Sequence, residues 1–592
     1  MAEKIEINWP EKKTEIHRLS LPFQTVEILT ENRILEHARL DKWIKGMDWP
    51  KNYPKDWKNR LIWGDNKYVM SSLISQGFAG KVDLIYIDPP FATGADFSIS
   101  IGIGDGNDET IKEASVIEQI AYRDTWGKGL SSYLQMMYER IVLMKELLSD
   151  TGSIYVHTDY RVDSYIRLIL DEIFGRENLL NEIIWYYQTG GASRKHYARK
   201  HDTIFFYSKT ENYKFYPERI KIPRTEKSLK RARNPKGARI SLDDTTKLPD
   251  DVFLIQALNP MAIERCGYPT QKPEELLEVI IKSSSDEGDI IADFFCGSGT
   301  TGVVAEKLGR RWILTDLSKY AIHITRKRLL DLHNYHSNYS IPCRPFIIQT
   351  LGNYQHHKFL ENKHPPVEEY RKFILELYEA TPIDGFTFLH GKKGDRFVYV
   401  ANVDSRVARM ELEGCANECV NSSRGNALDV LGWDFEPKIN NFVKNLKKLY
   451  GIDMALKYIP RIAEEITKIT AINKEIRFFN LNSVEIEPTV EGKTVQIKLK
   501  NFTFANPEFI TDEIRKKITH FTDYIDYWAV DFDYKNNIFH NMWQSFRKRR
   551  SRSLIKKVKH TYKTGGRKKI LVKIIDIFGN ESSALVEVEI KS

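Results

Sequence analysis

The chain has few cysteines and no long apolar run. Five cysteines among 592 residues are too few for a disulfide framework. Cys415 and Cys419 are spaced CxxxC, but no second pair accompanies them, so the spacing does not predict a metal site. No window is long and apolar enough to span a membrane, and the first residues lack the apolar core of a signal peptide. These absences favour a reducing cytoplasm, no membrane and no metal.

The charge of the chain is mildly positive, and its basic residues cluster. The net charge is +9, from 89 basic and 80 acidic residues, and the length predicts three or four domains. Nine Lys/Arg stand against two Glu between residues 218 and 239, and a second basic run covers residues 547–552. Such clusters are typical of polyanion binding, and a solvated surface is the alternative for each. A helicase P-loop and a nuclease motif are missing from the sequence.

An apolar run at residues 82–87 leads into Asp88-Pro89-Pro90-Phe91. The run predicts a buried parallel strand, which the two prolines end because they cannot donate to a sheet. A carboxylate, free carbonyls and an aromatic ring then stand where open α/β sheets bind ligands. Asp88 and the Pro89 carbonyl suit the two hydrogens of an exocyclic amino group, and Phe91 suits the face of its ring. The alternative is a Pro-Pro turn beside a core phenylalanine.

A second predicted strand, residues 289–295, leads into the glycine-rich turn at residues 296–302. A helix over 301–308 follows, and the next strand, 311–316, ends at an acid. The glycines satisfy GxGxxG, so a nicotinamide or flavin enzyme is one interpretation. The physics is general: glycine lets the backbone approach a ligand, a helix N-terminus attracts an anion, and the acid binds ribose hydroxyls.

Together the motifs resemble those of the DNA amino-methyltransferases, which methylate adenine N6 or cytosine N4. Asp-Pro-Pro-Phe resembles their catalytic motif, Asp-Phe-Phe-Cys-Gly-Ser-Gly-Thr-Thr resembles their S-adenosylmethionine motif, and Thr-Gln-Lys-Pro at 270–273 resembles the motif just before it. The catalytic motif comes first and the cofactor motif last, an order similar to the beta class, which includes methylation subunits of type III restriction–modification systems. The resemblance covers roughly residues 58–335. Asp rather than Ser at position 88 favours adenine.

The resemblance implies an α/β, Rossmann-like methyltransferase fold with permuted motif order, an inserted recognition element and a mixed α+β C-terminal region ending in a β-sandwich. Catalysis is expected from Asp88, Pro89, Pro90 and Phe91, without a metal. The expected S-adenosylmethionine-binding residues are Asp65, Thr270, Lys272, Asp293, Phe295, Gly297, Ser298, Gly299, Thr300, Thr301 and Asp316. The expected DNA contacts are Arg219, Lys221, Arg224, Lys230, Arg231 and Arg233. A turn that caps the next helix is the alternative for Asp65.

The predicted domains follow the motif order: N-terminal extension 1–57, catalytic half 58–209, target-recognition insert 210–265, cofactor half 266–335, accessory α+β region 336–515 and PKD-like β-sandwich 516–592. Strand–helix alternation predicts a largely parallel sheet with helices on both faces. Residues 92–121 are predicted to be irregular, covering the active site or gripping DNA. His157 is expected to be a satisfied histidine at a strand end, and a ligand or a base is the alternative. Further predictions are helices at 67–76, 133–148, 163–174, 274–283, 439–450 and 462–474, strands at 489–504 and 581–590, and strands with turns over 398–433.

The implied function is site-specific methylation of the N6 amino group of a flipped-out adenine in double-stranded DNA. The setting would be the modification component of a restriction–modification or related defence system. The alternatives are N4-cytosine methylation, methylation of RNA or protein amides, and a DNA-binding subunit that is inactive without a partner. The expected partners are double-stranded DNA, a second copy in a homodimer, and a restriction or helicase–nuclease subunit.

Overall fold

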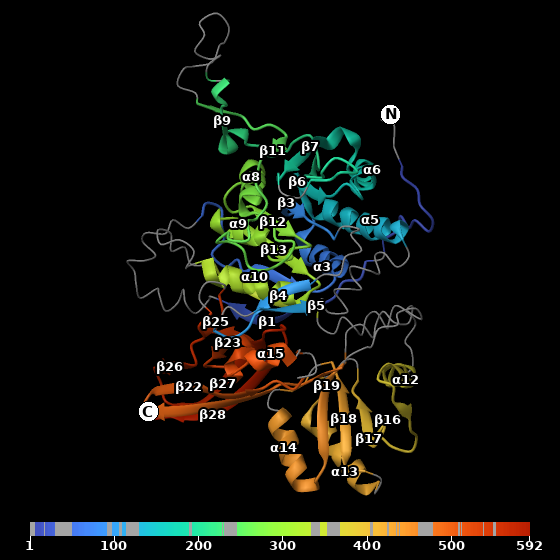
Figure 1. Cartoon of the computed structure of the whole chain (residues 1–592), viewed down its shortest axis with the longest axis vertical. Helices are drawn as coiled ribbons and strands as arrows, with labels where there is room; N and C mark the ends of the chain where they lie inside the picture. The colour runs from blue at the N-terminus through green and yellow to red at the C-terminus, as the bar shows by residue number, and fades with distance from the viewer. Residues whose placement is uncertain are drawn as a thin grey trace, which may run out of the picture. The chain divides into compact units, whose positions relative to one another are not determined.

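The computed structural model in Figure 1 describes residues 6–16, 18–29, 50–90, 98–105, 109–113, 129–188, 192–227, 229, 245–332, 344–351, 367–402, 406–422, 425–433, 435–436, 439–459, 478–506, 510, 512–536, 538–548 and 552–591. The chain forms two compact units. The first unit comprises residues 1–25, 29–99 and 118–351, and the second comprises residues 26–28, 100–117 and 352–592.

A mixed sheet of largely parallel strands forms the centre of the first unit, as predicted. Nine of its strands lie in the order β11-β7-β8-β6-β3-β12-β13-β2-β14, and among these nine only β8 is antiparallel to its neighbours, β6 and β7. The strands are β2 (Asn59–Trp63), β3 (Val82–Ile87), β6 (Leu148–Thr158), β7 (Leu179–Tyr186), β8 (His201–Ser208), β11 (Val252–Phe253), β12 (Ile290–Asp293), β13 (Arg311–Asp316) and β14 (Phe346–Thr350). The central strands are apolar and buried, which suits a sheet covered on both faces.

Two groups of helices cover this sheet. The first group is α3 (Asn66–Leu73), α5 (Leu130–Leu147) and α6 (Asp163–Phe174), and the second is α8 (Glu274–Ser284), α9 (Thr300–Lys307) and α10 (Lys319–Asp331). Helices contact each other within each group, and Figure 1 shows the groups on opposite sides of the strands. This arrangement confirms the predicted Rossmann-like α/β fold.

The paired strands β3 and β12 mark the place where the order of the sheet reverses. After β3 the chain proceeds to β6 on one side, whereas after β12 it proceeds to β13 on the other. Leu84 and Ile85 of β3 pair in parallel with Ile291 and Ala292 of β12. Both strands therefore end at the same edge, and such a reversal is where open α/β sheets bind ligands.

Several elements differ from their predictions. The helix predicted over 67–76 leaves α-helical geometry after Leu73 and passes through a π-helical turn, Ile74–Phe78, in which Gly77 has a φ of 87°. Within the segment predicted to be irregular, β4 (Ser98–Gly102) and β5 (Glu109–Glu113) pair as a two-stranded sheet. Most of the other residues between 92 and 121, and the helix predicted at 462–474, lie outside the described residues.

The second unit contains a smaller α/β layer. Its sheet has the order β15-β16-β17-β18-β19-β20, with β17, β18 and β19 parallel. The strands are β15 (Thr381–Pro382), β16 (Gly391–Lys393), β17 (Arg396–Val400), β18 (Ala427–Gly432), β19 (Asp453–Tyr458) and β20 (Phe479–Asn480). The predicted helix 439–450 is present as α14 (Ile439–Tyr450), and α12 (Val367–Leu377) packs in a separate apolar cluster with strands β17 and β18.

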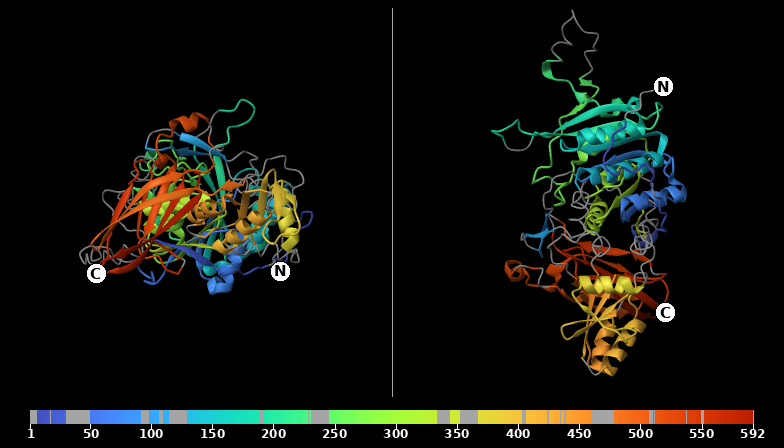
Figure 2. Two further views of the ribbon diagram at one scale, coloured as in Figure 1. Left: turned by 90° about the horizontal axis from the view of Figure 1, so that it is seen from below. Right: turned by 90° about the vertical axis from the view of Figure 1, so that its right-hand side faces the viewer.

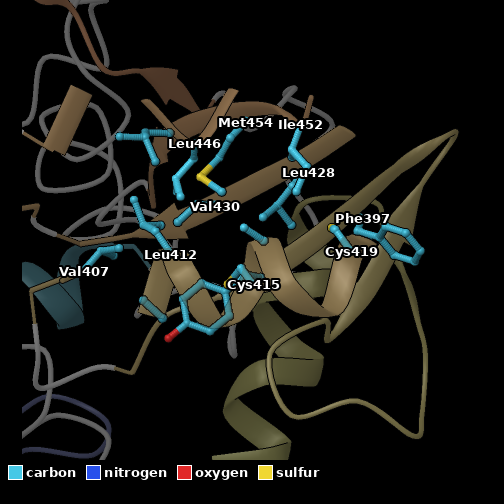
Figure 3. Close-up of a cluster of buried hydrophobic side chains, with 14 of the residues drawn as sticks. Phe397, Val407, Leu412, Cys415, Cys419, Leu428, Val430, Leu446, Ile452 and Met454 are labelled. Carbon is cyan, nitrogen blue, oxygen red and sulfur yellow. The ribbon is translucent and has the colours of Figure 1, made fainter. Parts of the chain in front are cut away.

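Helix α13 (Arg409–Asn421) was missed within residues 398–433, where the sequence predicts strands and turns. Its apolar side chains Leu412, Cys415 and Cys419 recur at helical spacing and pack in one cluster with strand residues such as Val430 (Figure 3). Burial raises the pKa of the Cys415 thiol. The CxxxC spacing therefore reflects the buried face of a helix.

A β-sandwich ends the chain, as predicted, but it begins before residue 516, where the sequence places its start. Its strands β21 (Ser483–Glu491) and β22 (Thr494–Thr503) lie inside the predicted accessory region 336–515. One sheet is β21-β22-β26, the other is β25-β23-β27-β28, and both contribute to one apolar core. The predicted strand 489–504 spans the turn of the β21–β22 hairpin, where Gly492 has a φ of 59°. The strands are β21 (Ser483–Glu491), β22 (Thr494–Thr503), β23 (Ile525–Asp531), β25 (Trp543–Phe546), β26 (Lys557–Thr561), β27 (Gly566–Asp576) and β28 (Glu581–Ile590). Further elements are β1 (Gln24–Leu29), β9 (Ile222–Pro223), β10 (Thr246–Lys247), β24 (Phe539–Asn541) and α15 (Asp512–Lys517).

Arg547, the first residue of the second basic cluster, is buried inside the second unit. Its guanidinium donates to the carbonyls of Ile525 and Thr522, both at 2.8 Å, and pairs with Asp105. It therefore supports the sandwich and does not present its charge to a polyanion.

No helix among the described residues is long and apolar enough to cross a membrane.

Candidate active site

Asp88 follows the last residue of β3, at the edge where the sheet reverses. Pro89 and Pro90 end the strand, so the carboxylate stands just beyond the ladder. The side chain is 16% exposed, and its Oδ2 accepts a hydrogen bond from Lys272 Nζ. Oδ1 is buried and has no hydrogen-bond partner among the described residues. A buried acceptor without a partner costs free energy, so this oxygen suits a donor from an external ligand.

Lys272 connects the two sequence motifs. Its ammonium contacts Asp88, and its backbone carbonyl accepts a hydrogen bond from Thr300 Oγ1 at 3.3 Å. The sequence assigns Lys272 to the cofactor, but in the structure its charged end lies on the predicted catalytic carboxylate. Thr270 is exposed, and Gln271 accepts from Cys266 N at 2.8 Å, which holds the segment before α8. The catalytic and glycine-rich motifs therefore share one site.

The glycine-rich turn needs its glycines for two physical reasons. Gly297 and Gly299 have φ values of 49° and 74°, in the left-handed region that other residues rarely adopt. A Cβ on Gly299 would lie 2.4 Å from Cγ2 of Thr325, and one on Gly297 would lie 3.3 Å from Cε1 of Tyr268. The turn is thus closely enclosed, and Gly299 directly precedes α9.

Asp316, the acid at the end of β13, holds this turn through backbone hydrogen bonds. Its Oδ2 accepts from Gly297 N and its Oδ1 accepts from Ser318 N, both at 2.8 Å. The predicted ribose-binding acid therefore also orders the glycine-rich turn. Because it stands at a strand end beside that turn, it remains placed for a polar ligand.

Asp293, the last residue of β12, is the most buried acid of the site. Its Oδ1 accepts from Phe295 N at 3.0 Å and its Oδ2 from Thr301 Oγ1 at 2.6 Å. Burial, together with the charges of Asp88 and Asp316, raises the pKa of Asp293 to about 7. Its partners are neutral donors, which compensate a buried charge less well than a cation does.

Comparison with known proteins identifies the family of the chain. A family of DNA methylases, N6_N4_Mtase, matches residues 82–327, which span both motifs. The type II methyltransferase M2.DpnII of Streptococcus pneumoniae is 31% identical over 261 residues, covering 42% of this chain and 82% of that protein. The chain belongs to the N6_N4_Mtase family of DNA methylases. It is therefore a DNA methyltransferase.

Two further relatives of the methylase differ in how much of them the chain covers. The DNA adenine methyltransferase YhdJ of Escherichia coli (strain K12) is 28% identical over 261 residues, covering 44% of this chain and 79% of that protein. The Mod subunit of the type III restriction–modification enzyme EcoP15I of Escherichia coli is 28% identical over 163 residues, covering 26% of this chain and 25% of that protein.

Arg328 of α10 is a residue of the methylase site that the sequence predictions missed. Its Nη1 donates to Ser298 O and to Thr300 Oγ1, both at 2.9 Å, and its Nη2 pairs with Glu274 at 3.0 Å. The buried guanidinium thus ties the glycine-rich turn to the start of α8. The sequence signal that could have identified Arg328 is an arginine among the apolar residues of a predicted helix, on the face that packs on the sheet.

Asp65 caps the helix that follows it, which was the alternative to its predicted role in cofactor binding. Its Oδ1 accepts from Lys67 N at 2.8 Å and caps α3, and it also pairs with Arg140 at 3.0 Å. The neighbouring Asn66 donates to Phe294 O at 2.7 Å, next to the glycine-rich turn. A role of Asp65 in cofactor binding stays a prediction.

A buried hydrogen-bonded chain runs across three strands beside Asp88. Tyr86 Oη lies 2.9 Å from His157 Nδ1, and His157 Nε2 lies 3.2 Å from Asp202 Oδ2. His157 is fully buried, so the prediction of a satisfied histidine is confirmed. Burial opposes ionisation of Asp202, but the hydrogen bond and charge of His157 outweigh it and lower the pKa of Asp202.

The basic insert of the methylase is only partly available for DNA. Arg219 donates to Ser285 O at 2.9 Å, pairs with Asp286 at 2.8 Å, and stacks on Tyr216. It therefore fastens the insert to the end of α8. Lys221 is exposed and Arg224 is half-buried. The remaining expected DNA contacts, Lys230, Arg231 and Arg233, and the expected stacking residue Phe91 lie outside the described residues. No cluster of potential metal ligands occurs in the part of the chain that the structure describes.

Proposed function

We propose that the protein transfers a methyl group from S-adenosylmethionine to the N6 amino group of an adenine flipped out of double-stranded DNA. The observation that carries this proposal is the Oδ1 of Asp88, which no described residue hydrogen-bonds and which is held beside the glycine-rich turn through Lys272. Such an oxygen can accept an N–H from an exocyclic amino group. An adenine inside a duplex cannot reach a recessed carboxylate, so the base must leave the stack.

The residues present fit S-adenosylmethionine. The N-terminus of α9, which begins at Thr300, offers backbone N–H groups and a positive dipole end for the carboxylate of the cofactor. Gly297 and Gly299 carry no side chain that would keep a ligand away from the backbone. Asp316 stands at the end of the next strand, where it suits ribose hydroxyls. When bound, the cofactor supplies an electrophilic methyl group.

Asp88 and the Pro89 carbonyl would each accept one hydrogen of the target amino group. These bonds favour a tetrahedral nitrogen, whose lone pair is no longer delocalised into the ring and can attack the methyl carbon. The bond between that carbon and the sulfonium sulfur would break as the carbon–nitrogen bond forms, and the surplus proton of the nitrogen would pass to the Asp88 carboxylate. Assistance of this kind contributes about 10² to 10⁴ in rate. Lys272 holds the carboxylate in one orientation, which keeps Oδ1 directed at the amino group. Phe91 would stack on the flipped base.

Adenine is the proposed base because Asp occupies position 88 and because a relative that is 28% identical over 261 residues is named a DNA adenine methyltransferase. The likeness to a type III Mod subunit covers 26% of this chain, and it supports a role as the modification component of a restriction–modification system. We further propose residues 210–265 as the target-recognition insert. A restriction subunit would then be a separate partner chain.

Mass spectrometry of nucleosides tests the proposal. DNA from cells that express the chain should contain N6-methyladenine, and DNA from cells that express Asp88→Ala should not. N4-methylcytosine in place of N6-methyladenine would support the other base of the family. Unmethylated DNA with the wild-type protein, both in cells and after addition of purified protein with S-adenosylmethionine, would refute the proposal.

A further inference from the structure

The loop that joins β7 to β8, residues 187–200, leaves the sheet at the same edge as Asp88. Strand β6 is parallel to β3, and β8 is antiparallel to β6. The first residue of β8 therefore lies at the edge where β3 and β6 end. Figure 2 shows this teal loop projecting from the first unit. The predictions from sequence place no DNA contact here.

The loop carries positive charge without any acid. From residue 187 to residue 201 the sequence contains four Lys/Arg, two His and no Asp or Glu. Arg194, Lys195 and Arg199 are exposed, and Tyr197 is 98% exposed. No carboxylate in the described ranges pairs with any of these three cations. Arg219 of the insert is different, because its guanidinium is already bound to Asp286.

The base of the loop is nevertheless fixed to the catalytic edge. Asp202, the second residue of β8, hydrogen-bonds His157 of β6, which in turn contacts Tyr86 of β3. Arg199 stacks on the ring of Tyr160, with the guanidinium carbon 3.9 Å from the ring centroid, and donates to Tyr160 Oη at 2.9 Å. Tyr160 follows β6 by two residues. Arg199 is thus held near the site, while none of the three cations pairs with a carboxylate of the described residues.

We propose that this loop, residues 192–200, binds the phosphate backbone of the DNA duplex next to the flipped base, with Arg194, Lys195 and Arg199 as the phosphate contacts. The proposal rests on the proposed function, since the polyanion is its DNA substrate. Phosphate contacts position a protein on a duplex without reading sequence. The loop therefore sets the register of Asp88 against the target base, and Tyr197 offers an aromatic face for stacking.

Salt-dependent binding of a fluorescent duplex of mixed sequence tests the loop and does not require the recognition site. The double variant Arg194→Ala/Lys195→Ala removes two loop charges. The control Lys55→Ala/Lys81→Ala removes two exposed lysines that precede β2 and β3, at the opposite edge of the sheet. The slope of log K against log salt is negative. Its magnitude should decrease by about 0.9 for each phosphate that the variant no longer neutralises, so by about 1 to 2 in the loop variant. The control should keep the wild-type slope.

Equal slopes for the loop variant and the wild type, or equal decreases in the loop and control variants, would overturn the proposal. Thermal unfolding of both variants checks that the fold is retained. A separate measurement of methyl transfer by the wild type keeps the two proposals apart. Loss of the salt-dependent binding in the loop variant, together with no methylated base from the wild type, would support the surface and refute the enzyme activity.

Discussion

Asp88 in the first unit and Asp429 in the second unit are both largely buried carboxylates that pair with a cation, but they differ in how many of their oxygens have a partner. Asp429 lies within the parallel strand β18 and is 2% exposed. Its Oδ1 accepts from Arg396 Nε at 2.6 Å, and its Oδ2 accepts from Tyr378 Oη at 2.6 Å. Both oxygens are occupied, and Lys457 adds a second cation at 3.5 Å. Asp88 has a cation on one oxygen and nothing from the described residues on the other.

The difference teaches how a strand-end carboxylate becomes a reactive group. Inside β18, donors come from the neighbouring strands β17 and β19 and from Tyr378 after α12, so Asp429 completes its own hydrogen bonds and stabilises the layer. Asp88 stands one residue beyond β3, where two prolines remove the backbone N–H groups that would otherwise be donors. A fully compensated carboxylate has a structural role, whereas one with an open oxygen can serve a ligand.

The largest expected effect is on Asp88. Asp88→Ala should lower methyl transfer by about 10² to 10⁴ or more, because the acceptor for the amino group is removed. Binding of S-adenosylmethionine, measured by calorimetry, and the thermal midpoint should change little. Asp429→Ala is the matched control, since the protein that remains folded should methylate at the wild-type rate. Near-normal methylation by Asp88→Ala would break the comparison.

Substitution of Asp429 should lower the stability of the protein and leave the rate of methyl transfer unchanged, which is the opposite of what we expect for Asp88. Asp429→Ala leaves Arg396, Tyr378 and Lys457 without their shared partner, which should cost roughly 2–5 kcal/mol of unfolding free energy. Denaturant unfolding followed by tryptophan fluorescence measures this decrease. A change below about 0.5 kcal/mol, the size typical of surface substitutions, would show that the cluster is not structural.

Lys272 is expected to act on the rate through Asp88. Lys272→Met removes the ammonium that orients the carboxylate, and misorientation of this kind can cost roughly 10²-fold in kcat. The dissociation constant of S-adenosylmethionine should stay near the wild-type value, and Lys272→Arg should recover part of the rate. If Lys272→Met instead weakens cofactor binding and leaves kcat intact, the assignment from sequence to the cofactor is the correct one.

The sequence predicts the framework of the site well because apolar runs and glycines are local signals. The strands at 82–87 and 311–316 and the helix at 163–174 were predicted at their observed bounds. The position of the Lys272 ammonium was not predicted, because a long flexible side chain takes its rotamer from tertiary neighbours. The basic loop was overlooked because only the antiparallel insertion of β8 brings residues 192–200 to the catalytic edge.

Helix α13 shows a different kind of limit. Leu412, Cys415 and Cys419 carry the helical period, but the polar residues between them and the apolar strands on either side concealed it. Buried partners such as Arg328 are a third case. A cation on the packed face of a helix is costly until a specific acceptor is placed against it, and that acceptor comes from another segment of the chain.

Asp293 extends the comparison to a carboxylate compensated by neutral donors only, and its effect appears only as a dependence on pH. Its pKa of about 7 lies above the ordinary value of about 3.9 that the unfolded chain has. The folded protein therefore holds this proton more tightly, and the stability that it contributes is full below about pH 4 and is lost as pH rises to about 7. Asp293→Asn cannot lose a proton. The stability of the variant relative to the wild type should rise with pH through this window, by at most about 1.4 kcal/mol for each pH unit, and level off above it. Thermal midpoints of both proteins across the window measure the difference in stability. A difference that stays constant across the window would mean that Asp293 is ionised throughout it.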